Sequence, residues 1–147
     1  MIHLLVLHGP NLNLLGGREP EVYGSETLDQ INDKIRRWSS SHDVEIQILQ
    51  SNHEGELIDT LHIQSQWADG IVLNPGGLAH TSVCLHDAVK AVGIPTVEVH
   101  VSNIFSRESF RRESIVSRSC VGIIAGFGGE GYIAACEQLK TLLLRTK

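Results

Sequence analysis

Five short, nearly continuous apolar runs constrain the fold of this chain most strongly. They are residues 2–7, 44–49, 70–73, 96–101 and 120–125. Runs of this length and composition are typical of strands that are buried on both faces of a parallel sheet. Helical patterns separate the runs, and strands that alternate with helices at this spacing predict an α/β domain with helices on both faces.

Four helices are expected between and after the strands, over residues 27–40, 51–67, 81–93 and 131–145. The first two begin with a capping-box pattern, in which Thr27 or Ser51 is followed three residues later by Gln or Glu. The third is capped by Thr81 or Ser82 and ends at Gly93, since glycine commonly terminates a helix.

This number of elements in 147 residues fits a flavodoxin-like, doubly wound five-stranded sheet of order 2-1-3-4-5. A (β/α)8 barrel is a poor fit because it needs about 250 residues. We therefore interpret residues 1–147 as a single domain. Ligands of such sheets bind beyond the carboxyl ends of the strands, at the switch point between strands 1 and 3. The loops at that point are residues 7–24 and the segment NPGGLAHTS, residues 74–82.

Charge and composition exclude several partners. A net charge of -5 and a pI near 5.9 argue against nucleic acid or an anionic membrane, because both require a basic face. The first apolar run is too short for a signal-peptide core or a membrane span, so we expect a cytoplasmic protein. Cys84, Cys120 and Cys136 are odd in number and far apart, which predicts small buried side chains instead of a disulfide framework.

Two apparent motifs are weak. The segment GFGGEG, residues 126–131, matches the dinucleotide pattern GxGxxG, but only sixteen residues follow it, and we expect a flexible turn that closes one side of a site. The segment HEGEL, residues 53–57, lacks the second histidine of a zinc-binding HExxH motif. The sequence therefore predicts no metal site.

Two of the eight histidines stand out by their position. His80 and His100 both fall at the carboxyl edge of the predicted sheet, near Asn74, where side chains face the ligand crevice. Arg111 is the arginine of the segment SRESFRRES that we expect to face inward, since a guanidinium suits a carboxylate or hydroxyls. The other arginines of that segment are expected in solvent. Surface or packing roles are expected for His3, His42, His62 and His86.

The long loop 7–24 adds a phenol and a second guanidinium to this edge. Tyr23 lies five residues after Arg18, and a neighbouring cation favours the phenolate form that can act as a base. A histidine at the same edge can act as the acid. This set of groups predicts removal of a proton next to a carbonyl with expulsion of hydroxide.

These residues also identify a family. The chain resembles the type II 3-dehydroquinate dehydratases, or type II dehydroquinases, over essentially its whole length. The resemblance is carried by GPNLNLLGGREPEVYG, QSNHEGELID, NPGGLAHTS, EVHVSNIFSRESFR and GFGGEGY. One departure is His8, where the family often has asparagine before the glycine, and no catalytic position is affected.

The resemblance implies dehydration of 3-dehydroquinate to 3-dehydroshikimate by anti elimination through an enol or enolate, in the shikimate or quinate pathway. Tyr23 would be the base that removes the C2 proton, and Arg18 would hold it as tyrosinate. His100 would protonate the departing C1 hydroxyl. Asn11 would position a water that stabilises the enolate oxygen, while Glu98 would help to orient its neighbours.

The resemblance further implies how substrate is held and how subunits assemble. The substrate-binding residues would be Asn74, His80, Arg111 and, through their main-chain amides, Val101 and Ser102. Asp87 would reach the site of an adjacent subunit within a trimer, and four trimers would form a dodecamer. No metal ion or organic cofactor is expected.

Two other classes of function compete with this one. A flavodoxin-like binding module could use NPGGLAHTS or GFGGEG to hold an FMN phosphate, and such a protein would be yellow when purified. A purely structural subunit would leave the polar cluster at the sheet edge unexplained.

Overall fold

The computed structural model describes residues 1–17 and 19–146, in which five parallel strands form one sheet of order β2-β1-β3-β4-β5. The predicted flavodoxin-like order is therefore confirmed. The strands are β1 (Ile2–His8), β2 (Val44–Gln50), β3 (Gly70–Asn74), β4 (Thr96–His100) and β5 (Gly122–Ala125).

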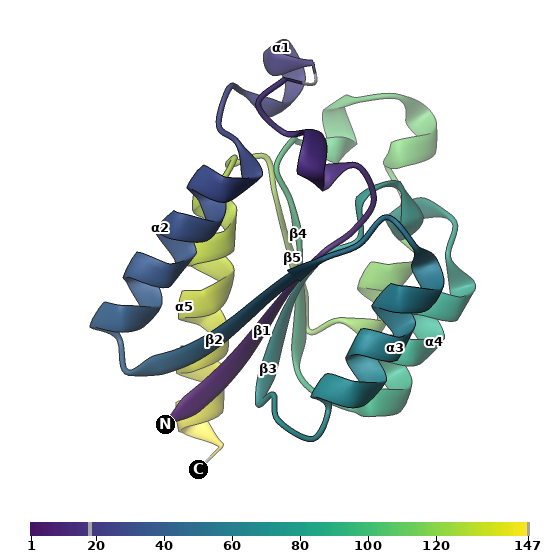
Figure 1. Cartoon of the computed structure of the whole chain (residues 1–147). Coiled ribbons are helices and arrows are strands. Elements are labelled where there is room, and N and C mark those ends of the chain that lie inside the picture. Colours follow the sequence, from purple (N-terminus) through teal and green to yellow (C-terminus); the bar gives the residue numbers. More distant parts are fainter. Residues whose placement is uncertain (18, 147) are drawn as a thin grey trace.

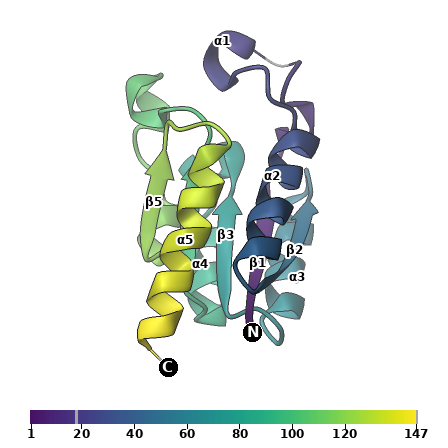
Figure 2. The ribbon, with the colours of Figure 1, turned by 90° about the vertical axis from the view of Figure 1, so that its left-hand side faces the viewer.

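Helices cover both faces of this sheet (Figure 1). Helices α2 (Leu28–Ser41) and α5 (Glu130–Arg145) lie on one face, and α3 (Glu54–Gln64) and α4 (Val83–Val92) lie on the other. A short helix, α1 (Pro20–Tyr23), projects beyond the carboxyl ends of the strands (Figures 1 and 2). The 3-10 helices are η1 (Leu12–Leu14), η2 (Gly76–His80), η3 (Ile104–Ser106), η4 (Ser109–Arg111) and η5 (Val116–Ser119).

Strand β1 divides its side chains between two apolar cores. Leu4 and Val6 pack in the core formed with α2 and α5, whereas Leu5 and Leu7 pack in the core formed with α3 and α4. Side chains alternate across a strand, so a strand buried on both faces must be apolar at every position. By the same alternation, His8 at the end of β1 points toward the α2 and α5 face.

Two of the predicted helix boundaries follow from caps seen in the structure. The capping box of α2 is complete: Thr27 Oγ1 accepts from the Gln30 amide, and Gln30 Oε1 accepts from the Thr27 amide. Ser82 caps α4 by accepting from the Leu85 amide at 2.9 Å. Gly93 ends α4 with a φ of 68°, a left-handed conformation that glycine adopts without strain.

The capping box predicted at Ser51 is wrong. Helix α3 begins at Glu54, and its N-cap is His53. The Ser51 hydroxyl instead accepts from the His53 amide in the turn that precedes the helix, so Ser51 lies outside the helix. The helix also ends at Gln64, before the predicted end at Trp67.

The cysteines are only partly as predicted. Cys136 is buried and Cys120 is half-buried, but Cys84 is exposed on α4, so its predicted burial is wrong. Cys84 lies in the first turn of an amphipathic helix whose buried face is occupied by Leu85, Ala88 and Val89. Among residues 1–17 and 19–146, no helix is long and apolar enough to cross a membrane.

Candidate active site

A cleft of about 150 Å³ opens at the carboxyl ends of β1, β3 and β4. This is the switch point of the sheet, where ligands of doubly wound folds bind. Eight of the predicted site residues line it: Asn11, Tyr23, Asn74, His80, His100, Val101, Ser102 and Arg111. Residues that are far apart in the sequence therefore meet in one small space.

Two glycines allow the loops after β1 and β3 to approach closely. A Cβ atom on Gly9 would lie 2.7 Å from the carbonyl carbon and oxygen of Pro75, and one on Gly76 would lie 2.9 Å from the Pro10 carbonyl oxygen. The Gly9 amide donates to the carbonyl of Asn74 at 2.7 Å. A side chain at either glycine would push the two walls of the cleft apart.

An imidazole and a carboxylate form a buried pair on one side of the cleft. The Glu98 carboxylate accepts a hydrogen bond from His100 Nε2 at 2.7 Å, and both side chains are almost fully buried. The two residues lie two positions apart on β4, so they point to the same face of the sheet. Ser114 Oγ lies 2.8 Å and 3.0 Å from the two Glu98 oxygens and anchors the carboxylate. This arrangement fixes the orientation of the His100 ring.

A second imidazole lies beside this pair. The His80 ring is stacked near that of His100, with centroids 6.2 Å apart and an interplanar angle of 22°. His80 Nδ1 donates to the carbonyl of Glu113 at 2.8 Å, which leaves Nε2 as the acceptor in the neutral ring.

A phenol and a guanidinium face each other across the cleft. Arg107 Nη1 donates to the Tyr23 hydroxyl at 2.9 Å and lies 3.3 Å from Ser102 Oγ. The Arg107 guanidinium carbon is also 5.0 Å from the centroid of the Tyr23 ring. A cation at this distance stabilises a phenolate, so the pair is suited to proton abstraction.

The contact with Arg107 corrects the sequence prediction. We expected the arginines around Arg111 to lie in solvent, but the Arg107 side chain is only 13% exposed and lines the cleft together with Arg111. No sequence periodicity could have identified it, because residues 101–121 are irregular and contain only 3-10 turns. Arg18, the predicted partner of Tyr23, lies outside the described residues.

Two predicted site residues do not line the cleft of their own chain. Glu98 lies beneath it, behind His100. Asp87 is exposed on α4, where its carboxylate contacts His86 Nδ1 at 2.9 Å.

The glycine-rich turn supports the cleft from behind. The amides of Gly126 and Gly128 donate to the carbonyls of His100 and Val101, at 3.2 Å and 3.0 Å. These bonds hold the end of β4, but no residue of the turn lines the cleft, so the prediction that the turn closes one side of the site is wrong.

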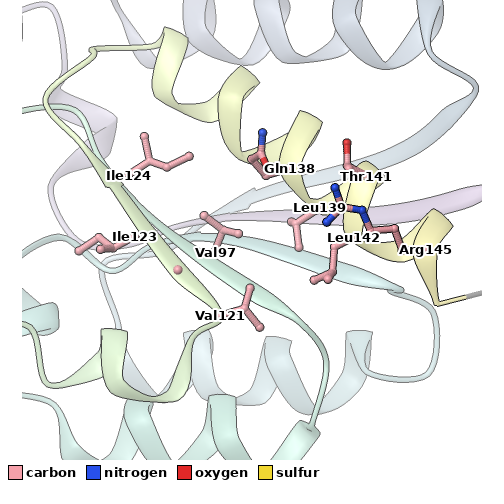
Figure 3. Close-up of a pocket in the computed structure, with 10 residues that line it drawn as sticks. Val97, Val121, Ile123, Ile124, Gln138, Leu139, Thr141, Leu142 and Arg145 are labelled. Atoms are coloured by element: carbon pink, nitrogen blue, oxygen red, sulfur yellow. The ribbon is translucent and has the colours of Figure 1, made fainter.

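A larger hollow of about 340 Å³ lies elsewhere, between β5 and α5 (Figure 3). Aliphatic side chains such as Val121, Ile123 and Leu142 form most of its lining. Of the described residues that line it, none carries an imidazole, a phenol or a carboxylate. Acid–base chemistry is therefore assigned to the smaller cleft. The described part of the chain also contains no group of three or more His, Cys, Asp or Glu side chains that could hold a metal ion.

Comparisons with known proteins agree with this site. The family model described as dehydroquinase class II matches residues 2–140. The 3-dehydroquinate dehydratase of Halothermothrix orenii is 50% identical over 143 residues, covering 97% of each chain. That of Pelotomaculum thermopropionicum is 54% identical over 139 residues, covering 95% of this chain and 96% of the relative. The crystal structure of type II dehydroquinase from Butyrivibrio crossotus superimposes with a TM-score of 0.93 at 41% identity, covering 95% of this chain and 97% of that chain. The chain therefore belongs to the class II dehydroquinase family.

Proposed function

We propose that this chain dehydrates 3-dehydroquinate to 3-dehydroshikimate by anti elimination through an enol or enolate intermediate. The observation that carries the proposal is the pairing of groups at one cleft: Tyr23 contacts Arg107 on one side, and on the other His100 is held from beneath by Glu98. These pairs supply a base and an acid, and members of the family carry the name 3-dehydroquinate dehydratase.

Tyr23 is the base that removes the C2 proton. Its hydroxyl accepts a hydrogen bond from Arg107, which holds the phenol oxygen at the cleft. Arg18, five residues before Tyr23, is proposed as a second cation that stabilises the transition state.

His100 is the acid that protonates the departing C1 hydroxyl. Glu98 acts through His100 by accepting from Nε2, so that the ring keeps one orientation. Asn11 lines the same cleft and positions a water that stabilises the enolate oxygen.

The other lining residues bind the substrate. Asn74, His80 and Arg111 hold its hydroxyls, and the main-chain amides of Val101 and Ser102 hold its carboxylate. All five border the cleft, where the size and polarity of the space suit a small anion.

Asp87 is proposed to act in a neighbouring subunit. Its side chain is exposed on α4, outside the cleft of its own chain, which is compatible with a role across a subunit boundary. We propose a trimer as the unit that shares Asp87, four trimers in a dodecamer, and a cytoplasmic location for the single catalytic domain.

One absorbance assay tests the function. Conversion of 3-dehydroquinate to the conjugated enone product should raise the ultraviolet absorbance, and EDTA should not change the rate because no metal or organic cofactor is proposed. A yellow protein without this activity would instead favour the FMN-binding alternative. Activity that is lost to EDTA and restored by a divalent ion would contradict the proposed cofactor independence.

A further inference from the structure

A buried chain of hydrogen bonds begins at Asn74 in the cleft and continues behind it through residues that the proposed mechanism does not use. Asn74 Nδ2 donates to the Tyr132 hydroxyl at 2.8 Å. The Tyr132 hydroxyl lies 3.1 Å from His8 Nδ1, and His8 Nε2 lies 2.8 Å from Asn32 Oδ1. His8 and Tyr132 are both fully buried, and Asn74 is nearly so. Buried polar groups in folded proteins usually have at least one hydrogen-bond partner, and each of these four side chains has one.

The donors and acceptors of these hydrogen bonds allow only one assignment of the protons. Asn32 Oδ1 is an acceptor, so His8 Nε2 carries the proton and Nδ1 is left as an acceptor. The Tyr132 hydroxyl therefore donates to His8 and accepts from Asn74. Burial lowers the pKa of His8 to about 4, so the ring is neutral near pH 7 and Nδ1 remains an acceptor for the Tyr132 hydroxyl.

Two hydrogen bonds fix the nitrogen and the oxygen of the Asn74 side-chain amide. Its nitrogen is held by Tyr132, and its oxygen accepts from the amide of Gly76 at 3.1 Å. An amide that is anchored at both atoms cannot rotate by 180° without losing both bonds. Among the described residues, Tyr132 is the one acceptor bonded to Asn74 Nδ2, which leaves the second N–H of that nitrogen for a ligand.

Four elements contribute to this hydrogen-bond chain. His8 ends β1, Asn74 ends β3 and is its direct partner in the sheet, and the two other residues come from α2 and α5. The His8 ring therefore bridges Tyr132 and Asn32.

We propose that Tyr132 is a positioning residue: with His8 and Asn32 behind it, its hydroxyl holds the Asn74 amide in the orientation that binds a substrate hydroxyl. The inference rests on the proposed function, because it assigns Asn74 to substrate binding. Asn74 holds substrate in the ground state and the transition state alike, so loss of its orientation raises KM and leaves kcat nearly unchanged.

Tyr132→Phe tests this proposal, since it removes the hydroxyl and little else. If the amide then samples both orientations equally, the competent fraction falls to about one half and KM should rise about twofold, with kcat equal to that of the wild type. The increase should vanish when Tyr132→Phe is made in an Asn74→Ala background, because no amide is left to orient. Cys136→Ala is the matched control: it loosens the same helix one turn away, and its KM should equal that of the wild type.

The outcomes separate this proposal from the proposed function. An active wild type whose KM is unchanged by Tyr132→Phe, or raised equally with and without Asn74, would overturn the positioning role alone. A wild type that does not convert 3-dehydroquinate would overturn both. If Tyr132→Phe does not fold, the same measurement is made on Asn32→Ala, which removes the half-buried residue at the other end of the hydrogen-bond chain. A rise in KM that depends on Asn74 would support the proposal, and an unchanged KM would overturn it.

Discussion

Acid should destabilise the wild-type protein through His8, and His8→Asn should remove this effect. The imidazole is fully buried, and desolvation lowers its pKa from 6.5 to about 4, although the hydrogen bond with Asn32 opposes the change. In the unfolded chain the same ring is hydrated and titrates near 6.5. Between these values the unfolded state binds a proton that the folded state does not bind. The contribution of His8 to stability is therefore complete above about pH 6.5 and is lost as the pH falls toward 4.

The size of this loss follows from the two pKa values. A difference of about 2.5 between 6.5 and about 4 corresponds to about 3 kcal/mol in the free energy of unfolding when the titration is complete. At pH 5 the unfolded ring is almost fully protonated and the folded ring is about one-tenth protonated, so about 2 kcal/mol is already lost.

Denaturant unfolding at pH 7.5 and pH 5.0, at one protein concentration, measures this loss. The wild type should lose about 2 kcal/mol more than His8→Asn between the two pH values. His62→Asn is the matched control, because His62 is exposed on α3 and its removal should leave the wild-type loss unchanged. Equal losses in the wild type and His8→Asn, within about 0.5 kcal/mol, would refute the argument that a buried neutral imidazole governs this pH dependence.

Three predictions concern the catalytic groups. Tyr23→Phe should keep the fold and substrate binding while kcat falls by at least about a hundredfold, and near wild-type kcat would mean that another group is the base. Arg107→Ala should lower kcat by about tenfold or more, because it removes the hydrogen bond to the Tyr23 hydroxyl, and an unchanged kcat would show that Arg107 does not act on Tyr23. Co-assembly of Asp87→Ala and Tyr23→Phe chains should give more activity than the two variants alone, because mixed trimers contain complete sites. Purely additive activity would place Asp87 outside the neighbouring site.

The fold was predictable because its determinants are local in the sequence. Each strand is an apolar run, and α2 begins at Thr27 because a side-chain cap and its partner lie three residues apart. The same pattern failed at Ser51, where the hydroxyl is used by a turn that the sequence does not distinguish from a helix cap. The exposure of Cys84 was missed because it depends on which face of α4 meets the sheet.

The site was predictable only where it coincides with the ends of strands. His100 and Asn74 were placed correctly because parallel strands bring their carboxyl ends to one edge. The support behind them was not predicted: Tyr132 lies 58 residues from Asn74 and 124 from His8 in the sequence. Arg107 was missed for a related reason, since it meets Tyr23 across 84 residues from an irregular segment. Such contacts are created by tertiary packing and leave no local periodicity.

The proposed acid depends on the register of β4. Val97 and Val99 pack in the core with α2 and α5, so Glu98 and His100 must point to the opposite face, toward Ser114 and His80. A shift of one residue would turn His100 into the α5 core and leave a valine at the cleft. Strand β4 is paired on both sides, with β3 and β5, and the amides of the glycine-rich turn bind the carbonyls at its carboxyl end. The GFGGEG segment therefore contributes to the chemistry without facing the cleft, because it fixes the strand end from which the acid projects.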